Sequence, residues 1–269
     1  MNLYQKQFAK ELNFEGQSRP HKTLVICSTP RCGSHMLGHA LFETKKFGFP
    51  LEYANPANLA EWKLRFNEED TLKVMETLKT IRTSDNGVFG IKLHYQHLTQ
   101  FSSFEQVLET FEDPYFVVLT RDNLLKQAVS LDIANQTGVW IEGQEPIASE
   151  VEFDTERVRE ALKDIIIDSA SWKYLLSIHN CRFLDLSFSD VAGDIAGAIT
   201  KIADFMNVDI DTTMVSNELV TKKQGSSVNQ KWFNDFLSQA NKKDTLLSEF
   251  ARKSRYQKLV AKFSGEYKQ

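Results

Sequence analysis

Four short apolar runs stand out along the chain, and longer stretches between them repeat apolar residues at helical spacing. The runs are rich in β-branched and aromatic residues and cover residues 23–27, 88–93, 115–120 and 181–188. Such runs are typical of strands buried on both faces, and helices between them indicate parallel strands joined by crossovers. The pattern therefore predicts an α/β fold, with a parallel sheet flanked by helices.

The helical periodicity places the remaining elements. Helices are predicted over residues 35–47, 59–66, 71–82, 104–111, 123–136, 155–179 and 193–207, with two more near the C-terminal end. We expect residues 1–269 to form a single domain. Ligands of an open parallel sheet bind beyond the carboxyl ends of the strands, so one site is expected where the four runs end.

Composition narrows the class of protein. The net charge of -4 gives no sign of a nucleic-acid or anionic-membrane partner. The 3 cysteines are an odd number with no C-x-x-C spacing, which argues against a disulfide framework and a thiolate zinc site. The start lacks the apolar region of a signal peptide, and no apolar run reaches membrane-spanning length. A cytoplasmic protein is expected.

The first run leads into a sequence suited to binding an anion. The run ends at Thr29-Pro30, turns through Arg31-Cys32-Gly33-Ser34 and enters a helix at His35-Met36. The first N–H groups of a helix lack backbone partners and favour negative charge. Gly33 allows close approach of a ligand, Arg31 supplies a positive charge and Ser34 a hydroxyl. The loop lacks the G-x-x-x-x-G-K-[ST] motif of nucleotide triphosphatases, and an ordinary strand-to-helix turn is the alternative.

A second candidate for anion binding follows the third run. Arg121 comes at the end of that run, and Ser130 lies two to three turns along the next predicted helix. The pair can clamp a second phosphate some distance from the first loop. Alternatively, Arg121 is a surface charge, Asp122 or Asn123 caps the helix, and Ser130 only fills it.

These motifs, in this order, resemble the sulfotransferases, and more narrowly the bacterial trehalose sulfotransferase family. The resemblance lies in residues 31–34, 48–53, 89–92, 121–130 and 136–140 and weakens beyond them. It implies a P-loop-like sulfotransferase fold and the sulfuryl donor 3′-phosphoadenosine 5′-phosphosulfate (PAPS), which leaves as 3′,5′-adenosine bisphosphate (PAP). No metal is implied, and a homodimer is possible.

The resemblance also implies the residues that bind the donor. The phosphate loop binds the 5′-phosphosulfate, the later Arg and Ser bind the 3′-phosphate, and a late basic loop closes over the donor. The corresponding residues here are Arg31, Cys32, Gly33, Ser34, His35 and Met36, then Arg121 and Ser130, then Lys223 and Gln224. From composition alone, that late loop is equally well an exposed linker.

The expected acceptor is a carbohydrate or glycolipid hydroxyl. The family's general base maps onto Glu52, and Arg31 stabilises the leaving phosphate. His35, which replaces the usual Ser or Thr of the loop, is the competing acid or base. Phe49 replaces a Glu that holds trehalose in the family, which puts trehalose itself in doubt. The predicted acceptor-binding residues are Phe49, Glu52, Tyr53, Asn55, Lys92, His94 and Trp140.

Some of these residues also have a purely structural interpretation. Lys92 can belong to a structural ion pair, and Trp140 can simply pack. His35, His39 and Glu43 recur at every fourth residue, but one polar helix face explains them better than a metal site does. The rival functions are a nucleotide-dependent, kinase-like enzyme and a nucleotide-binding protein that has lost its base.

Overall fold

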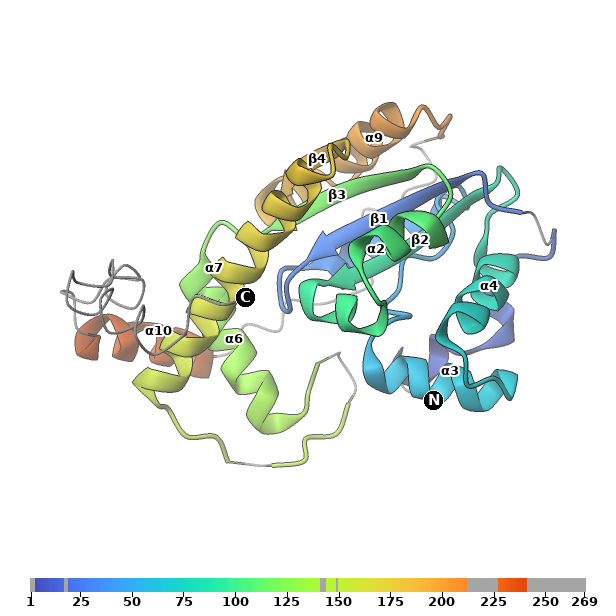
Figure 1. Ribbon diagram of the computed structural model, residues 1–269. Helices are drawn as coiled ribbons and strands as arrows, with labels where there is room; N and C mark the ends of the chain where they lie inside the picture. The colour runs from blue at the N-terminus through green and yellow to red at the C-terminus, as the bar shows by residue number, and fades with distance from the viewer. Residues whose placement is uncertain (1–2, 17–18, 141–143, 149, 212–226, 241–269) are drawn as a thin grey trace, which may run out of the picture.

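A four-stranded parallel sheet forms the centre of the molecule, with the strand order β2-β1-β3-β4 (Figure 1). The computed structural model describes residues 3–16, 19–140, 144–148, 150–211 and 227–240. The strands are β1 (Lys22–Ser28), β2 (Val88–His94), β3 (Pro114–Thr120) and β4 (Phe183–Ser187). The four apolar runs are therefore the four strands, and the predicted parallel α/β sheet is confirmed.

Helices cover both faces of the sheet because alternate side chains of each strand point to opposite sides. One face packs against α3 (Pro56–Phe66), α4 (Thr71–Arg82), α5 (Phe104–Thr110) and the second half of α7 (Thr155–Ile178). The other face packs against α2 (Ser34–Glu43), α8 (Phe188–Gly193) and α9 (Ile195–Met206). The central strands are thus buried on both sides, as their continuous apolar character predicted.

A smaller cluster lies beside the sheet. The first half of α7 packs there with α6 (Leu124–Thr137) and α10 (Ser227–Gln239), around Trp232 and Phe236. Helix α7 therefore belongs to two apolar clusters, one at each end, as its long diagonal course in Figure 1 illustrates.

Several helix boundaries differ from the predicted ones. Helix α2 ends at Glu43, not at residue 47, because Lys45 takes the left-handed conformation with φ of 58°. Asn55 caps α3, so this helix begins at Pro56 instead of residue 59. The helix predicted over residues 193–207 is α9, which begins at Ile195. Four short elements were not predicted, namely the helices α1 (Leu3–Lys6) and α8 and the 3-10 helices η1 (Lys10–Leu12) and η2 (Tyr95–Gln100).

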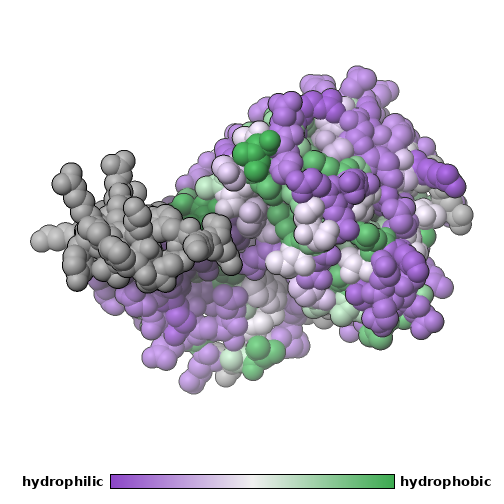
Figure 2. All heavy atoms as spheres, viewed as in Figure 1, coloured by the Kyte–Doolittle hydropathy of each residue, from purple (hydrophilic) through white to green (hydrophobic). Residues whose placement is uncertain are grey.

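The surface is mostly polar. Figure 2 shows hydrophilic residues over most of the face viewed, with smaller hydrophobic areas between them. Of the two helices predicted near the C-terminal end, α10 is one, and residues 241–269 lie outside the described part of the chain. Among the helices that are described, none has both the length and the apolar character needed to span a membrane.

Candidate active site

The loop between β1 and α2 has the backbone of an anion cradle. Arg31 and Gly33 both have positive φ, 66° and 93°. Gly33 is the N-cap of α2 and offers no side chain to its first N–H groups, which leaves the helix N-terminus available to a ligand. A Cβ at Gly33 would lie 2.3 Å from Phe188, so no larger residue fits where α8 begins.

The start of α6 holds this loop in place. Gln127 donates through Nε2 to Thr29 Oγ1 at 2.8 Å and to the Pro30 carbonyl at 2.7 Å. Gln127 is completely buried, so these hydrogen bonds are shielded from water. Gln127 belongs to the segment that resembles the family, but no role for it was predicted from the sequence. Its role is to join the loop to α6.

The two predicted anion-binding signals meet at Arg31. Arg31 donates through Nε to Ser130 Oγ at 3.1 Å and through Nη1 to the Trp140 carbonyl at 2.6 Å. Arg121 donates through Nη1 to the Arg31 carbonyl at 3.0 Å. Arg121 and Ser130 therefore lie against the first loop, closer than the separate second clamp that we expected.

The electrostatics of this region favour a bound anion. Burial lowers the pKa of both arginines, and the charge of Arg121 lowers that of Arg31 further. The Arg121 guanidinium also lies over the Phe188 ring, 5.2 Å from its centroid. Two cations beside a helix N-terminus repel each other, and an anion between them relieves that repulsion.

Glu52 lies at the carboxyl end of β2. Leu51 forms an isolated parallel bridge with Ile91, and its carbonyl accepts the Lys92 N–H at 2.9 Å. This brings Glu52 Oε1 to 2.8 Å from Lys92 Nζ and 3.3 Å from His94 Nε2. Lys92 and His94 thus share one side of β2, as strand alternation predicted.

Two neighbours set the charge of Glu52. Burial by itself raises the pKa of the carboxyl, but the charge of Lys92 and the charge and hydrogen bond of His94 hold it well below its usual range. The other ring nitrogen of His94, Nδ1, lies 3.1 Å from Ser28 Oγ. The Glu52 side chain remains 23 % exposed, so an ionised carboxylate with a fixed orientation reaches the surface here.

A further histidine, His97, supports this arrangement and was not identified from the sequence. The His94 backbone N–H donates to His97 Nδ1 at 3.2 Å, and burial lowers the pKa of His97 to about 3. A neutral His97 is consistent with the acceptor role of its Nδ1. The only sequence signal for His97 was its position three residues after His94. That spacing brings the two side chains together only because residues 95–100 form the 3-10 helix η2.

His35 lies at the first turn of α2 and is neutral. Burial, with smaller effects from Lys92 and other charges, lowers its pKa to about 2, and burial lowers that of His39 to about 4. The two rings meet edge to face with centroids 4.4 Å apart, an arrangement that explains their spacing without a metal. The buried Nε2 of His35 has no hydrogen-bond partner within the described residues, so it can receive one from a ligand.

The remaining predicted acceptor residues lie at different depths. Phe49 and Tyr53 are each 1 % exposed: Phe49 stacks on Phe42, and the Tyr53 hydroxyl donates to the Phe49 carbonyl at 2.7 Å. Asn55 caps α3 and also donates to Glu52 Oε2 at 3.4 Å. Trp140 is 41 % exposed beside Arg31. The structure brings Asn55 to Glu52 but places Phe49 and Tyr53 in the core beneath it.

The remaining residues predicted to bind the donor are three residues of the loop after β1 and two residues of the late loop. Cys32, Ser34 and Met36 are all buried, and Ser34 is the first residue of α2 and not its cap. Lys223 and Gln224 lie outside the described residues. Within the described part of the chain, no group of three or more His, Cys, Asp or Glu is arranged to hold a metal ion.

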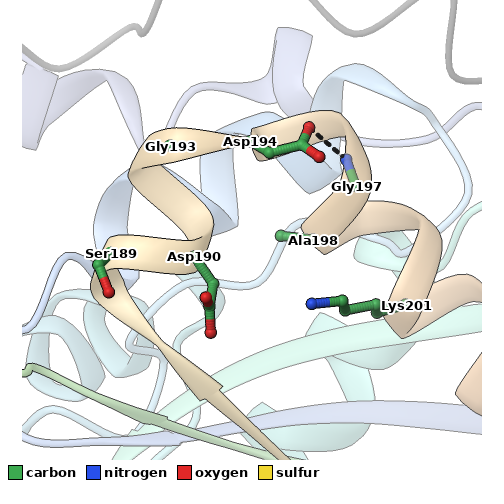
Figure 3. Close-up of a pocket in the computed structure, with 7 residues that line it drawn as sticks. All are labelled: Ser189, Asp190, Gly193, Asp194, Gly197, Ala198 and Lys201. Carbon is green, nitrogen blue, oxygen red and sulfur yellow. Dashed lines mark hydrogen bonds between the residues drawn. The ribbon is translucent and has the colours of Figure 1, made fainter.

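A shallow depression of about 350 Å³ lies elsewhere, between α8 and α9 (Figure 3). Asp190 and Lys201 point toward each other across it, and Asp194 accepts the Gly197 N–H at 2.8 Å as the cap of α9. The hydrogen bond from the Ser189 N–H to Asp122 Oδ2, at 3.2 Å, links this region to β3. Asp122 is therefore a structural acceptor, and the depression contains none of the predicted site residues.

Comparison with solved structures finds sulfotransferases at low identity. The sulfotransferase domain of the Synechococcus PCC 7002 olefin synthase is 14% identical, with a TM-score of 0.46, over 94% of this chain and 97% of that one. A sulfotransferase from Alicyclobacillus acidocaldarius is 14% identical, with a TM-score of 0.48, over 82% and 92%. A mouse sulfotransferase complexed with PAP is 14% identical, with a TM-score of 0.46, over 96% and 94%.

Comparison with protein families gives the assignment. A search of curated proteins finds no significant match. The family model of the Stf0 sulphotransferases matches residues 23–239, which include the sheet except its first residue, the loop after β1, Glu52, Arg121 and Ser130. The match covers most of the chain and agrees with the order of the motifs, and the chain therefore belongs to the Stf0 sulphotransferase family.

Proposed function

We propose that this protein transfers a sulfuryl group from PAPS to a hydroxyl of a carbohydrate or glycolipid. The observation that carries the proposal is the meeting of Arg31, Arg121 and Ser130 at the N-terminus of α2. Family membership supports sulfuryl transfer, and the mouse relative in complex with PAP supports this class of donor. PAPS supplies an activated sulfuryl group on a phosphate that leaves readily.

The residues of the loop fit such a donor. It carries phosphate groups at two positions, and the chain offers two guanidinium groups, a helix N-terminus and the unpartnered Nε2 of His35. We assign the 5′-phosphosulfate to the loop of Arg31, Cys32, Gly33, Ser34, His35 and Met36, and the 3′-phosphate to Arg121 and Ser130. Arg31 stabilises the charge that develops on the leaving phosphate. Closure of Lys223 and Gln224 over the donor stays a prediction.

Glu52 is assigned as the general base. A hydroxyl becomes nucleophilic as its proton is removed, and the carboxylate of Glu52 is ionised and oriented for this by Lys92 and His94. His35 is the less suitable base because its Nε2 is buried, whereas the Glu52 carboxylate is partly exposed and can reach an acceptor hydroxyl. Its role is to form a hydrogen bond while neutral.

The acceptor residues follow from this assignment. Asn55, Lys92 and His94 surround Glu52, and Trp140 offers an exposed ring that can stack on a sugar. Phe49 and Tyr53 support Glu52 from below. A single domain over residues 1–269, a cytoplasmic location and a homodimer stay predictions.

The test is direct transfer. The purified chain, given PAPS and sugar acceptors such as trehalose or octyl glucoside, is expected to form a sulfated sugar and release PAP without added magnesium. Mass spectrometry of both products measures this. Phosphorylation of the same acceptors from ATP and magnesium, with no sulfated product from PAPS, would instead support a kinase-like enzyme.

A further inference from the structure

Helix α7 carries one acidic residue within its buried stripe. Its buried positions are Val158, Ala161, Ile165, Trp172 and Leu176, and Asp168 takes the helical step between Ile165 and Trp172. The first three positions belong to the cluster formed with α6 and α10, and the last two pack against the sheet. Asp168 therefore lies where α7 passes from one apolar cluster to the other.

The next turn of α7 shows what Asp168 faces. The Trp172 ring packs edge to face on Tyr95, with centroids 5.5 Å apart, and Tyr95 directly follows His94 at the end of β2. Residues four apart lie on the same face of a helix, so Asp168 also faces this end of β2. Burial and Asp164 raise the pKa of Asp168, while His94 is the positive neighbour that lowers it.

Asp168 forms no salt bridge with another described residue. By contrast, Glu52 is paired with Lys92, and the buried Asp132 is paired with Arg157. No hydrogen bond or ion pair joins the half-buried Asp168 to a described residue. An unpaired carboxylate in such a place is costly unless a ligand or water supplies hydrogen-bond donors.

We propose that Asp168 binds the acceptor, by accepting hydrogen bonds from hydroxyl groups next to the one that is sulfated. The inference rests on the proposed function, because Glu52 contacts His94 at the end of β2, and α7 packs through Trp172 on Tyr95, the next residue along the chain. An acceptor that places one hydroxyl at Glu52 can thus present a neighbouring hydroxyl to α7. The site then selects acceptors with several hydroxyl groups over alcohols with one.

The experiment compares two acceptors that share an alkyl chain, octyl glucoside and 1-octanol. Asp168→Leu completes the apolar stripe of α7, and Asp168→Asn keeps the shape but removes the charge. Loss of hydrogen bonds to a charged group is expected to lower kcat/KM for octyl glucoside roughly ten- to hundredfold in Asp168→Leu. The value for 1-octanol and the affinity for PAP are expected to stay unchanged.

The control is Asp164→Asn, which removes an exposed charge one turn earlier on the same helix. Because Asp164 raises the pKa of Asp168, its removal keeps Asp168 ionised, and turnover of both acceptors is expected to stay unchanged. An equal loss with both acceptors in the Asp168 variants indicates a structural role and overturns the inference. Two results with the natural chain also overturn the inference about Asp168, provided that the chain binds PAP. One is equal use of octyl glucoside and 1-octanol, and the other is sulfation of neither. Failure of the natural chain to bind PAP contradicts the proposed function itself.

Discussion

Replacing Glu52 by Gln is expected to abolish most of the turnover while donor binding survives. Burial alone would raise the pKa of this carboxyl, but Lys92 Nζ at 2.8 Å and His94 Nε2 at 3.3 Å hold it well below its usual range. Nearly every molecule therefore carries the ionised base at neutral pH. Gln keeps the shape and removes the proton acceptor, so kcat should fall by at least about a hundredfold, within the 10²–10⁴-fold typical of general bases.

The variant also loses stability, which the assay has to separate from catalysis. The side chain of Lys92 is 3% exposed and loses its counter-charge. Removing one partner of a buried pair costs about 3–5 kcal/mol, and the 23% exposure of Glu52 places this case near the lower figure. Urea unfolding gives the folded fraction, calorimetry gives the affinity for PAP, and kcat is measured with both substrates saturating.

A comparison with His35→Asn tests whether Glu52 is the general base. Asn at position 35 removes an imidazole whose Nε2 is buried, whereas the Glu52 carboxylate reaches the surface, so the effect of His35→Asn on kcat should be the smaller one. Turnover of Glu52→Gln within tenfold of the natural chain, with a collapse in His35→Asn, would move the base onto the phosphate loop.

Three further outcomes are expected. Lys92→Met removes the cation that favours ionised Glu52, so the pKa of Glu52 rises and activity is lost at a higher pH as the solution is acidified. A pH–rate profile whose acidic side does not shift contradicts this. Arg121→Ala removes a charged hydrogen bond, worth roughly 1.5–3 kcal/mol, and should weaken PAP about tenfold or more but AMP little. Equal weakening in calorimetry would take Arg121 away from the 3′-phosphate. Phe49→Ala empties a site that is 1 % exposed and should cost about 3–5 kcal/mol in urea unfolding, whereas a loss under about 1 kcal/mol would mean that the core does not depend on it.

The strands and the phosphate loop could be predicted from the sequence because their signals are local. A strand buried on both faces needs a continuous apolar run, and a tight turn before a helix needs a residue such as Gly33. The helix ends were less predictable. Lys45 ends α2 by a left-handed backbone conformation that its residue type does not favour.

The contacts of the site could not be predicted in the same way, because they join segments far apart in the chain. The hydrogen bond between Arg31 and Ser130 spans 99 positions, and that between Ser28 and His94 spans 66. Asp168 gave no signal at all, since one Asp in a helix is ordinary until the helix is seen to cross the end of β2. Phe49 was taken from the resemblance as an acceptor residue, and only the fold reveals its stacking on Phe42.

The central claim is that the loop after β1, with Arg121 and Ser130, binds a nucleotide carrying a 3′-phosphate. Isothermal titration of the natural chain with PAP, ADP and ATP, with and without magnesium, tests it most directly. The account predicts that PAP binds at one site without magnesium, and at least about tenfold more tightly than ADP, which lacks the 3′-phosphate that Arg121 would hold. Binding of ATP with magnesium more tightly than PAP, or equal affinity for PAP and ADP, would contradict it.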